Sequence, residues 1–299
     1  MPPARLADGL EQLRGVVGKS FMLTAKLRSL LGSLAFASRT MPRLRTYSKR
    51  AWDAMRDSRK GRVGKNGRRR SRRWTRVRRG MRVDFQFLLK IWESLDGVRL
   101  VPEADWSEAD EGFVFVDASG HVTRDDGSVA KAGGYGGVNL ETGEVFGGEW
   151  PEEAAGLDIN VLEALTSLIA VSLWGEGWRG RRITLRSDNT AAVAVLNKGV
   201  ARDAALASLT RRLFFEEVKH DCQVRFRHVA GVANQLGDLP SRGRFAELDA
   251  FTLEKYGRVM ERVPINVDVR DILCRLTRAR RTRAETAECS GLGSPRRRR

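Results

Sequence analysis

The sequence predicts an α/β fold, in which a mixed five-stranded sheet is flanked by helices and preceded by a helical basic segment. The order of apolar patterns in the second half of the chain is three strands, a helix, a strand, two helices, a strand and a helix. Glu141, Thr142 and Gly143 lie between two strand patterns and indicate a hairpin. The first three strands should therefore be antiparallel, and the later strand–helix–strand alternation predicts parallel neighbours.

The individual elements follow from apolar runs bounded by turn residues. We expect strands over residues 113–119, 134–140, 144–149, 182–187 and 224–229. We expect helices over residues 160–173, 190–197 and 203–220, and another helix after Asp238. The stretch 120–133 should be a loop.

The N-terminal third has a different composition. Residues 9–56 and 82–100 carry apolar side chains at helical spacing, whereas residues 58–80 have almost none and Trp74 is their one large apolar group. We divide the chain into a helical segment 1–57, a basic linker or arm 58–81, a helix and acidic loop 82–111, an α/β domain 112–245, a helical extension 246–274 and a basic, disordered tail 275–299.

The net charge of +17 is unevenly distributed along the 299 residues. Residues 1–100 contain 26 Lys/Arg against 7 Asp/Glu, and residues 275–299 contain 9 against 2, which leaves −9 for the stretch between them. Basic arms around an acidic unit are typical of proteins that bind a polyanion, most often nucleic acid. The alternative is a solubilising, disordered tail.

The cysteine content and the hydropathy of the chain argue against a zinc-binding, disulfide-bonded, membrane or secreted protein. The three cysteines and three histidines form no CxxC pair or Cys/His cluster, so neither a structural zinc site nor a disulfide is predicted. No apolar run approaches the roughly 20 residues that span a bilayer, and the N-terminus lacks a signal-peptide core. We therefore expect an intracellular protein of the cytoplasm or nucleus, not secreted and without a membrane partner.

Four carboxylates lie where predicted strands end or predicted helices begin: Asp117, Glu163, Asp188 and Asp238. Two hard cations about 3.5–4 Å apart can activate water and stabilise a leaving oxyanion, and Mg²⁺ takes oxygen ligands. Metal-bound water is already acidified, so no histidine base is required. The four acids therefore suggest a magnesium site for phosphodiester hydrolysis, and their crowding should raise some of their pKa values until metal binds.

Each acid also has a simpler interpretation as a turn or cap residue. Asp117 could end its strand in a turn, and Glu163 could form a capping pair with Asn160. Asp188 and Asp238 could each cap the helix that follows, with Pro240 in the first turn of the last one.

Four segments, FVFVDAS, INVLEAL, LRSDNTAAVAVLNKG and HVAGVANQLGDLPSR, resemble ribonuclease H domains. Within these, residues 112–242 resemble the version carried by tyrosine-recombinase (DIRS-type) and pararetroviral reverse transcriptases. More weakly, LRSLLGSLAFASRTMPRLR and FLLKIWESLDG resemble the thumb or connection region upstream of that domain.

The resemblance implies a ribonuclease H-like fold and an endonuclease that cuts the RNA strand of RNA–DNA hybrids, leaving a 3′-hydroxyl and a 5′-phosphate. The four acids would then be the catalytic, metal-binding residues for two Mg²⁺ ions, with Mn²⁺ able to substitute. The polymerase part of the same polyprotein would be a partner. Hybrid contacts would come from Ser119, Asn160, Asn189, Thr190, Asn234 and Arg242.

Alternatives to some of these contacts stay open. Asn160 and Asn189 could be helix caps, while Asn234, Ser241 and Arg242 could position the last helix or touch phosphate.

The chain departs from the family in several places. The loop that carries a mobile histidine in cellular members is shortened, and His228 is expected to lie on a strand with a structural role. Gly237 replaces the usual alanine and should loosen the start of the last helix. No YxDD-like motif is present, so no polymerase activity is expected from this chain alone.

Two alternative functions remain. One is a non-catalytic nucleic-acid-binding remnant that binds through residues 58–80. The other is a different two-metal nuclease of the same fold, such as a resolvase, integrase or exonuclease.

Overall fold

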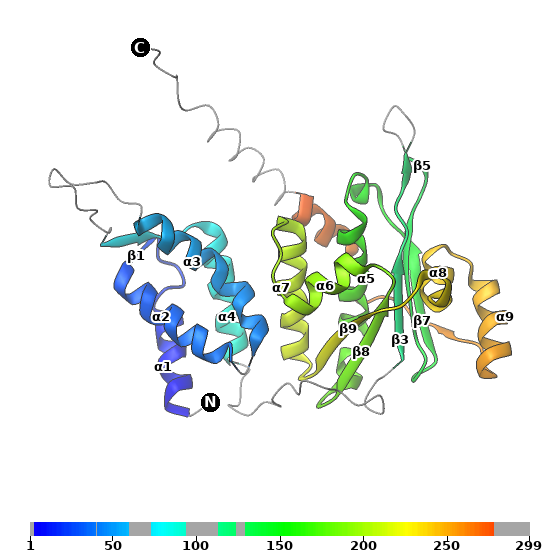
Figure 1. Cartoon of the computed structure of the whole chain (residues 1–299), viewed down its shortest axis with the longest axis horizontal. Helices are drawn as coiled ribbons and strands as arrows, with labels where there is room; N and C mark the ends of the chain where they lie inside the picture. Colours follow the sequence, from blue (N-terminus) through cyan, green and yellow to red (C-terminus); the bar gives the residue numbers. More distant parts are fainter. Residues whose placement is uncertain (1–2, 40, 60–72, 94–112, 124–128, 278–299) are drawn as a thin grey trace, which may run out of the picture. The chain divides into compact units, whose positions relative to one another are not determined.

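The computed structural model describes residues 3–39, 41–59, 73–93, 113–123 and 129–277. The chain forms two compact units, residues 1–105 and 106–299, and each is described by itself (Figure 1). Much of the predicted basic arm (60–72), the acidic loop of 101–111 and most of the predicted tail (278–299) lie outside the described residues.

Unit 1 is mainly helical, as the apolar spacing predicted. Its helices are α1 (Pro3–Arg14), α2 (Thr24–Ala37), α3 (Arg45–Arg59) and α4 (Arg79–Glu93), with a short 3₁₀ turn η1 (Pro42–Leu44) before α3. The core between them contains fully buried leucines together with Tyr47 and Phe85. Isolated helices of 12 to 15 residues are only marginally stable in water. Here each helix buries one apolar stripe against the others, and this packing stabilises the helical structure.

A two-stranded antiparallel ribbon interrupts the helices of unit 1. Strand β1 (Phe21–Leu23) pairs with β2 (Trp74–Arg76), and bonds from Val77 N–H to Ser20 C=O (2.8 Å) and from Thr24 N–H to Arg73 C=O (2.9 Å) extend the ladder at both ends. The last part of the predicted arm is therefore ordered strand, which the sequence did not predict. Alternation explains why, since Thr75 and Val77 are buried while their neighbours are exposed.

In the part of unit 2 that is described, the central sheet has six strands in the order β10-β7-β6-β3-β8-β9. The strands are β3 (Val114–Ala118), β6 (Gly134–Asn139), β7 (Glu144–Glu149), β8 (Arg182–Ser187), β9 (Gln223–His228) and β10 (Glu261–Arg262). Strand β6 is antiparallel to β3 and β7, whereas β8 is parallel to β3 and β9. This confirms the predicted mixed α/β fold, the five predicted strands and their directions.

Two features of the sheet region were not predicted. Strand β10 adds two residues to the edge, parallel to β7. The stretch expected to be a loop contains a separate small ribbon, in which β4 (Val122–Thr123) pairs with β5 (Val129–Lys131). Both pairings are too short to leave a strand pattern in the sequence.

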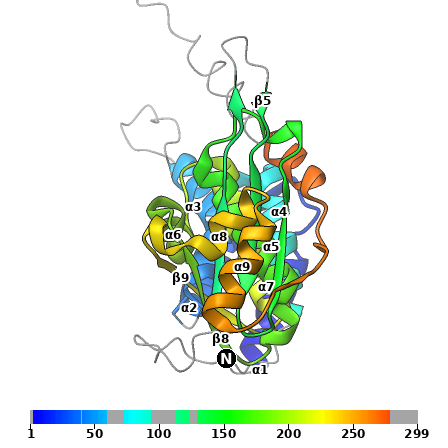
Figure 2. The same cartoon turned by 90° about the vertical axis from the view of Figure 1, so that its right-hand side faces the viewer.

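Helices α5 (Ile159–Trp174) and α7 (Ala204–Lys219) cover one face of the sheet, and α8 (Gln235–Ser241) lies on the other (Figures 1 and 2). Helix α5 is apolar on nearly all sides, as expected of a helix packed between sheet and helix. The expectation that no apolar run approaches the length of a membrane span is wrong, because Ile159–Trp178 has that length and hydropathy. However, 78% of an 18-residue window within it is buried inside the unit, as in the core helix of a globular domain.

The shorter helices complete unit 2. Helix α6 (Thr190–Lys198) packs beside β9, where the Asn197 side chain exchanges hydrogen bonds of 2.7 and 2.9 Å with the backbone of Phe226. Helix α9 (Phe245–Tyr256) follows α8, and the helical residues 269–277 bury Ile272 and Leu273 in the main core. The predicted helical extension thus consists of two helical stretches separated by β10, and it packs within unit 2.

Candidate metal centre

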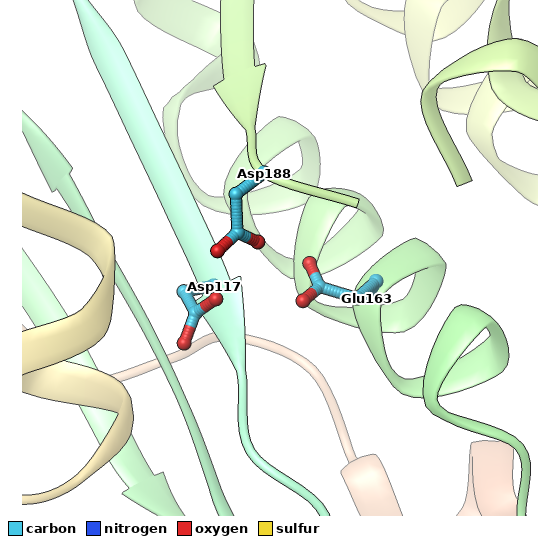
Figure 3. Close-up of side chains that lie close together, drawn as sticks. All are labelled: Asp117, Glu163 and Asp188. Atoms are coloured by element: carbon cyan, nitrogen blue, oxygen red, sulfur yellow. The ribbon is translucent and has the colours of Figure 1, made fainter. Parts of the chain in front are cut away.

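Three carboxylates from three different elements converge at the carboxyl ends of β3 and β8. Asp117 is on β3, Asp188 directly follows β8 and Glu163 is the fifth residue of α5. One oxygen from each side chain lies within 4.8 Å of the others, and Figure 3 shows the three groups pointing toward one another. The sequence predicted one site made of four acids, and the structure brings together three of them, Asp117, Glu163 and Asp188.

Glu163 is held in place by polar groups from both strands. Its carboxylate accepts hydrogen bonds from the backbone N–H of Ala118 (3.3 Å) and from the hydroxyl of Ser187 (3.2 Å). The capping interpretation of Glu163 is wrong, because the N-cap of α5 is Asp158, whose carboxylate accepts from Asn160 N–H at 2.8 Å. Glu163 is therefore a buried acid bound to the strand ends.

Asp117 is fixed from the opposite face of the sheet. The hydroxyl of Ser241, at the end of α8, donates a 2.6 Å hydrogen bond to Oδ2 of Asp117. This contact needs α8 to lie directly on the sheet, and glycine makes that possible. A Cβ on Gly136, which pairs with Asp117 in the ladder, would come within 2.4 Å of the backbone nitrogen of Ser241.

Gly237 has the same effect from the helix side. A Cβ at this position would lie 2.8 Å from the carbonyl carbon of Val116 and 2.9 Å from Nδ2 of Asn234. The expectation that Gly237 merely loosens the helix start is therefore wrong, since the missing side chain allows α8 to contact β3.

Burial and the neighbouring negative charges raise the pKa values of two of the three acids. Burial is the largest cause that raises the pKa of Glu163 to about 9, and the charges of Asp117 and Asp188 add to it. Burial likewise raises the pKa of Asp117 to about 6, against the lowering effect of the Ser241 hydrogen bond. Among the described residues no Lys or Arg forms an ion pair with Asp117, Glu163 or Asp188.

Asp238 lies beside this group without being part of it. Its Oδ1 accepts a 2.5 Å hydrogen bond from Nε of Arg242, one helical turn later, while its charge contributes to the raised pKa of Asp117. The predicted position of Asp238 before the last helix is wrong, because α8 begins at Gln235 with Asn234 as its N-cap. Asp238 therefore points from within the helix, and its capping interpretation is also excluded.

The donor set fits a hard divalent cation. All three converging groups are carboxylates, they approach from different directions, and two of them are almost fully buried. Hard cations such as Mg²⁺ and Mn²⁺ bind carboxylate oxygens, and a bound cation would offset the burial and the repulsion that raise the two pKa values. The group is therefore compatible with divalent metal binding.

The predicted contact residues lie around this centre in different environments. Asn189 is the N-cap of α6, with Oδ1 accepting from Ala192 N–H at 2.9 Å, so its capping role is confirmed and Asp188 is not the cap. Thr190 is exposed in the first turn of α6, and Asn160 is half-buried in the first turn of α5. The hydroxyl of Ser119 bonds to the backbone of Gly134 and Ser241.

Two positions differ from the sequence-based expectation. Asn234 is fully buried and donates from Nδ2 to Val116 C=O at 3.1 Å, so it joins α8 to β3. This agrees with the interpretation that Asn234 positions the last helix and argues against a contact with substrate. His228 ends β9 as predicted, but its side chain is exposed and has no hydrogen bond in the described part of the chain, which argues against a structural role.

The connection after His228 is short, as predicted. Only six residues precede α8, including the 3₁₀ turn η5 (Gly231–Ala233), where a Cβ on Gly231 would lie 3.1 Å from Oδ2 of Asp188.

The contribution of Ser187 to the site was missed by sequence reasoning, although it stands immediately before Asp188. Ser241 was considered only for helix positioning or phosphate contact. Ser187 immediately precedes Asp188, and Ser241 follows Asp238 by about one helical turn. This proximity of a hydroxyl residue to a candidate acid could have identified both of them from the sequence.

No protein-family model matches the chain, and no curated protein sequence matches it at a significant level. Among solved structures, unit 2 is similar to RNase H1 from the halophilic archaeon Halobacterium salinarum, at 14% identity and a TM-score of 0.36, over 46% of this chain and 98% of that one. It is also similar to the N-terminal RNase H domain of rv2228c from Mycobacterium tuberculosis, solved as a maltose-binding protein fusion, at 16% identity and a TM-score of 0.33, over 45% of this chain and 94% of that one. At such identities these similarities concern the fold alone.

Proposed function

We propose that unit 2 is a divalent-metal-dependent endonuclease that cleaves the RNA strand of RNA–DNA hybrids. The observation that carries the proposal is the convergence of Asp117, Glu163 and Asp188 within 4.8 Å at one end of the sheet. The SDNT and HVAGVAN segments around these acids, which resemble those of retroelement ribonuclease H domains, support the choice of substrate.

In this proposal Asp117, Glu163 and Asp188 hold Mg²⁺, with Asp238 as a fourth ligand and two ions as the expected number. When bound, the metal supplies positive charge for the phosphoryl oxygens and acidifies a coordinated water. Glu163 and Asp117 must release their protons for this, which their raised pKa values make dependent on the cation. Asp238 must exchange its hydrogen bond with Arg242 for the metal.

The chain's other polar groups would orient the hybrid. Asn160, Asn189 and Thr190 lie on the first turns of two helices that begin beside the acids, where they could contact 2′-hydroxyls in the shallow minor groove of the hybrid. Arg242 is more than half exposed and, once released from Asp238, would contact phosphate.

Cleavage assays on the full chain test this proposal. We expect Mg²⁺ to support cutting of a hybrid labelled on its RNA strand, with none when the DNA strand carries the label and none in EDTA. Asp117→Asn should abolish cutting, and Glu254→Gln, an exposed acid on α9, is the matched control. Equal cleavage by Asp117→Asn and the wild-type protein would contradict the proposal.

The origin of the chain in a retroelement reverse transcriptase, with the polymerase part of a polyprotein as partner, is part of the proposal and is supported by the quoted segments. A different two-metal nuclease is the second candidate, since the acid cluster alone does not select the substrate. Comparing cleavage of hybrid, double-stranded RNA and double-stranded DNA under the same conditions separates the two.

A further inference from the structure

The β1–β2 ribbon of unit 1 exposes two aromatic side chains on one surface. Phe21 is 55% exposed and Trp74 is 52% exposed, although large aromatic groups usually lie inside a protein. In the register of the ribbon Phe21 pairs with Arg76 and Leu23 pairs with Trp74, so the two rings are diagonal neighbours on the same face. The residues between them, Met22 and Thr75, point into the core.

The ribbon is firmly held, so the two rings project from an ordered support. The hydroxyls of Thr24 and Thr75 share a buried hydrogen bond of 2.9 Å, and backbone bonds continue the ladder beyond both strands. Met22 anchors the inner face of the ribbon. An aromatic pair fixed in this way loses little conformational entropy when it binds a ligand.

A hollow of about 680 Å³ lies beside this face. Phe21 and Trp74 both line it, together with Arg14, Lys19 and Lys26. Two acids of α1, Asp8 and Glu11, are also among its polar lining residues. Asp8 accepts a hydrogen bond from Gln12, and Arg14 is paired with Glu93.

Exposed basic side chains lie in the ribbon and next to it in the sequence. Lys19, Lys26, Arg73 and Arg76 are exposed and form no ion pair within the described residues. A surface that combines exposed rings with unpaired cations matches the chemistry of single-stranded nucleic acid, whose phosphates need positive charge and whose unstacked bases need a flat apolar partner. Base-paired duplex hides those base faces, so the aromatic pair favours a single strand.

We infer that the β1–β2 face of unit 1, centred on Phe21 and Trp74, binds single-stranded nucleic acid by base stacking. This site is separate from the acids of unit 2 and needs no metal. It also differs from a purely electrostatic basic arm, because stacking contributes affinity that salt does not screen.

Fluorescence anisotropy of a labelled oligothymidylate with the full chain in EDTA tests the inference. Trp74→Ala should weaken binding roughly tenfold and Phe21→Ala should act in the same direction, as expected for losing one stacked base. Trp52→Ala, which removes a partly exposed tryptophan from α3, is the matched control and should bind as the wild-type protein does.

Salt separates stacking from charge in the same titration. Affinity should fall between about 50 and 200 mM salt, because phosphate contacts release counterions. The ratio between wild-type and Trp74→Ala affinities should persist across that range, whereas Arg76→Gln should reduce the slope of log affinity against log salt by about 0.7. Unchanged affinity in both aromatic variants, or an equal loss in Trp52→Ala, would overturn the inference.

A second measurement covers the case in which an aromatic variant does not fold. Photo-crosslinking of a bromodeoxyuridine oligonucleotide to the wild-type chain should modify peptides that contain Trp74 or Phe21. Crosslinks confined to other peptides would refute the site. Both measurements are made in EDTA and need no metal, so the outcome is independent of the nuclease proposal.

Discussion

The hydroxyl of Ser241 donates a 2.6 Å hydrogen bond to Oδ2 of Asp117, which joins the end of helix α8 to strand β3 across 124 positions of the chain. The same hydroxyl lies 3.0 Å from the backbone carbonyl oxygen of Asp238, so the two oxygens share its one proton. A short bond to a carboxylate stabilises its ionised form and fixes its orientation. The Ser241 bond therefore favours the charged form of Asp117 and fixes the direction of its carboxylate.

Ser241→Ala should weaken Mg²⁺ binding roughly tenfold, as is usual when a hydrogen bond to a metal ligand is lost. Without the bond the pKa of Asp117 should rise further above about 6, so the loss should be larger at pH 6 than at pH 8. Calorimetric titration at both pH values measures it, with Ser172→Ala, a buried serine on α5, as control. Unchanged affinity at both pH values would refute this role.

The metal-free protein should lose stability as pH rises, because of Glu163. Its carboxyl has an ordinary pKa of 4.5 and a folded-state pKa of about 9, so between these values only the folded chain retains the proton. Each pH unit in that window therefore lowers the unfolding free energy by up to roughly 1 kcal/mol. The stabilisation is complete below pH 4.5 and is lost as pH rises through 9.

Glu163→Gln removes this titration and should flatten the pH dependence. Thermal unfolding in EDTA at about pH 5.5, 7 and 8.5 should show a variant that gains stability over the wild-type protein as pH increases. The stability of Glu254→Gln should change with pH in the same way as that of the wild-type protein. If the Glu163→Gln curve is also parallel, the buried acid does not carry the predicted charge penalty.

Arg242→Gln should strengthen Mg²⁺ binding by up to roughly fivefold, because it frees Asp238 and removes a cation near Asp117. The same change should weaken hybrid binding if Arg242 contacts phosphate. Arg244→Gln, whose arginine pairs with Glu247 on the surface, is the control for lost positive charge. Weaker Mg²⁺ binding by Arg242→Gln would show that Arg242 does not compete with the metal.

Gly237→Ala should destabilise unit 2 by about 1–3 kcal/mol, since its Cβ would meet the backbone of Val116 at 2.8 Å. Cleavage should fall as well, because α8 carries Asp238 and Ser241. Gly177→Ala is the control, since a Cβ there meets nothing within 4 Å. If Gly237→Ala melts at the same temperature as the control, α8 can move away from β3 without loss of stability, and the prediction is wrong.

Much of the fold could be predicted because its strands are marked by strong local patterns. The run ITLRS alternates apolar and polar residues. A glycine-rich turn precedes it, and an aspartate and the start of a helix follow it, so β8 forms at the predicted residues. Strands β1, β2 and β10 were missed because two or three residues carry no periodicity, and their pairing comes from tertiary packing.

The sequence identified the acids of the site more reliably than the residues that hold those acids in place, such as Ser187 and Ser241. Asp117, Glu163 and Asp188 converge because topology brings strand ends together. The start of α8 was misplaced, since Asp238 followed by Pro240 is a strong local start signal. The structure instead begins the helix at Gln235, where burial of Asn234 and close contact at Gly237 decide the outcome.

The most direct test of the central claim is the single-turnover rate at which the full chain cuts the RNA strand of a hybrid in Mg²⁺, measured for the wild-type protein and Asp188→Asn. If the carboxylate cluster holds the catalytic metal, the wild-type protein cuts and the variant is slower by at least about a hundredfold while remaining folded. An Asp188→Asn protein that cuts as fast as the wild type, or a wild-type chain that leaves the hybrid intact, would contradict the account.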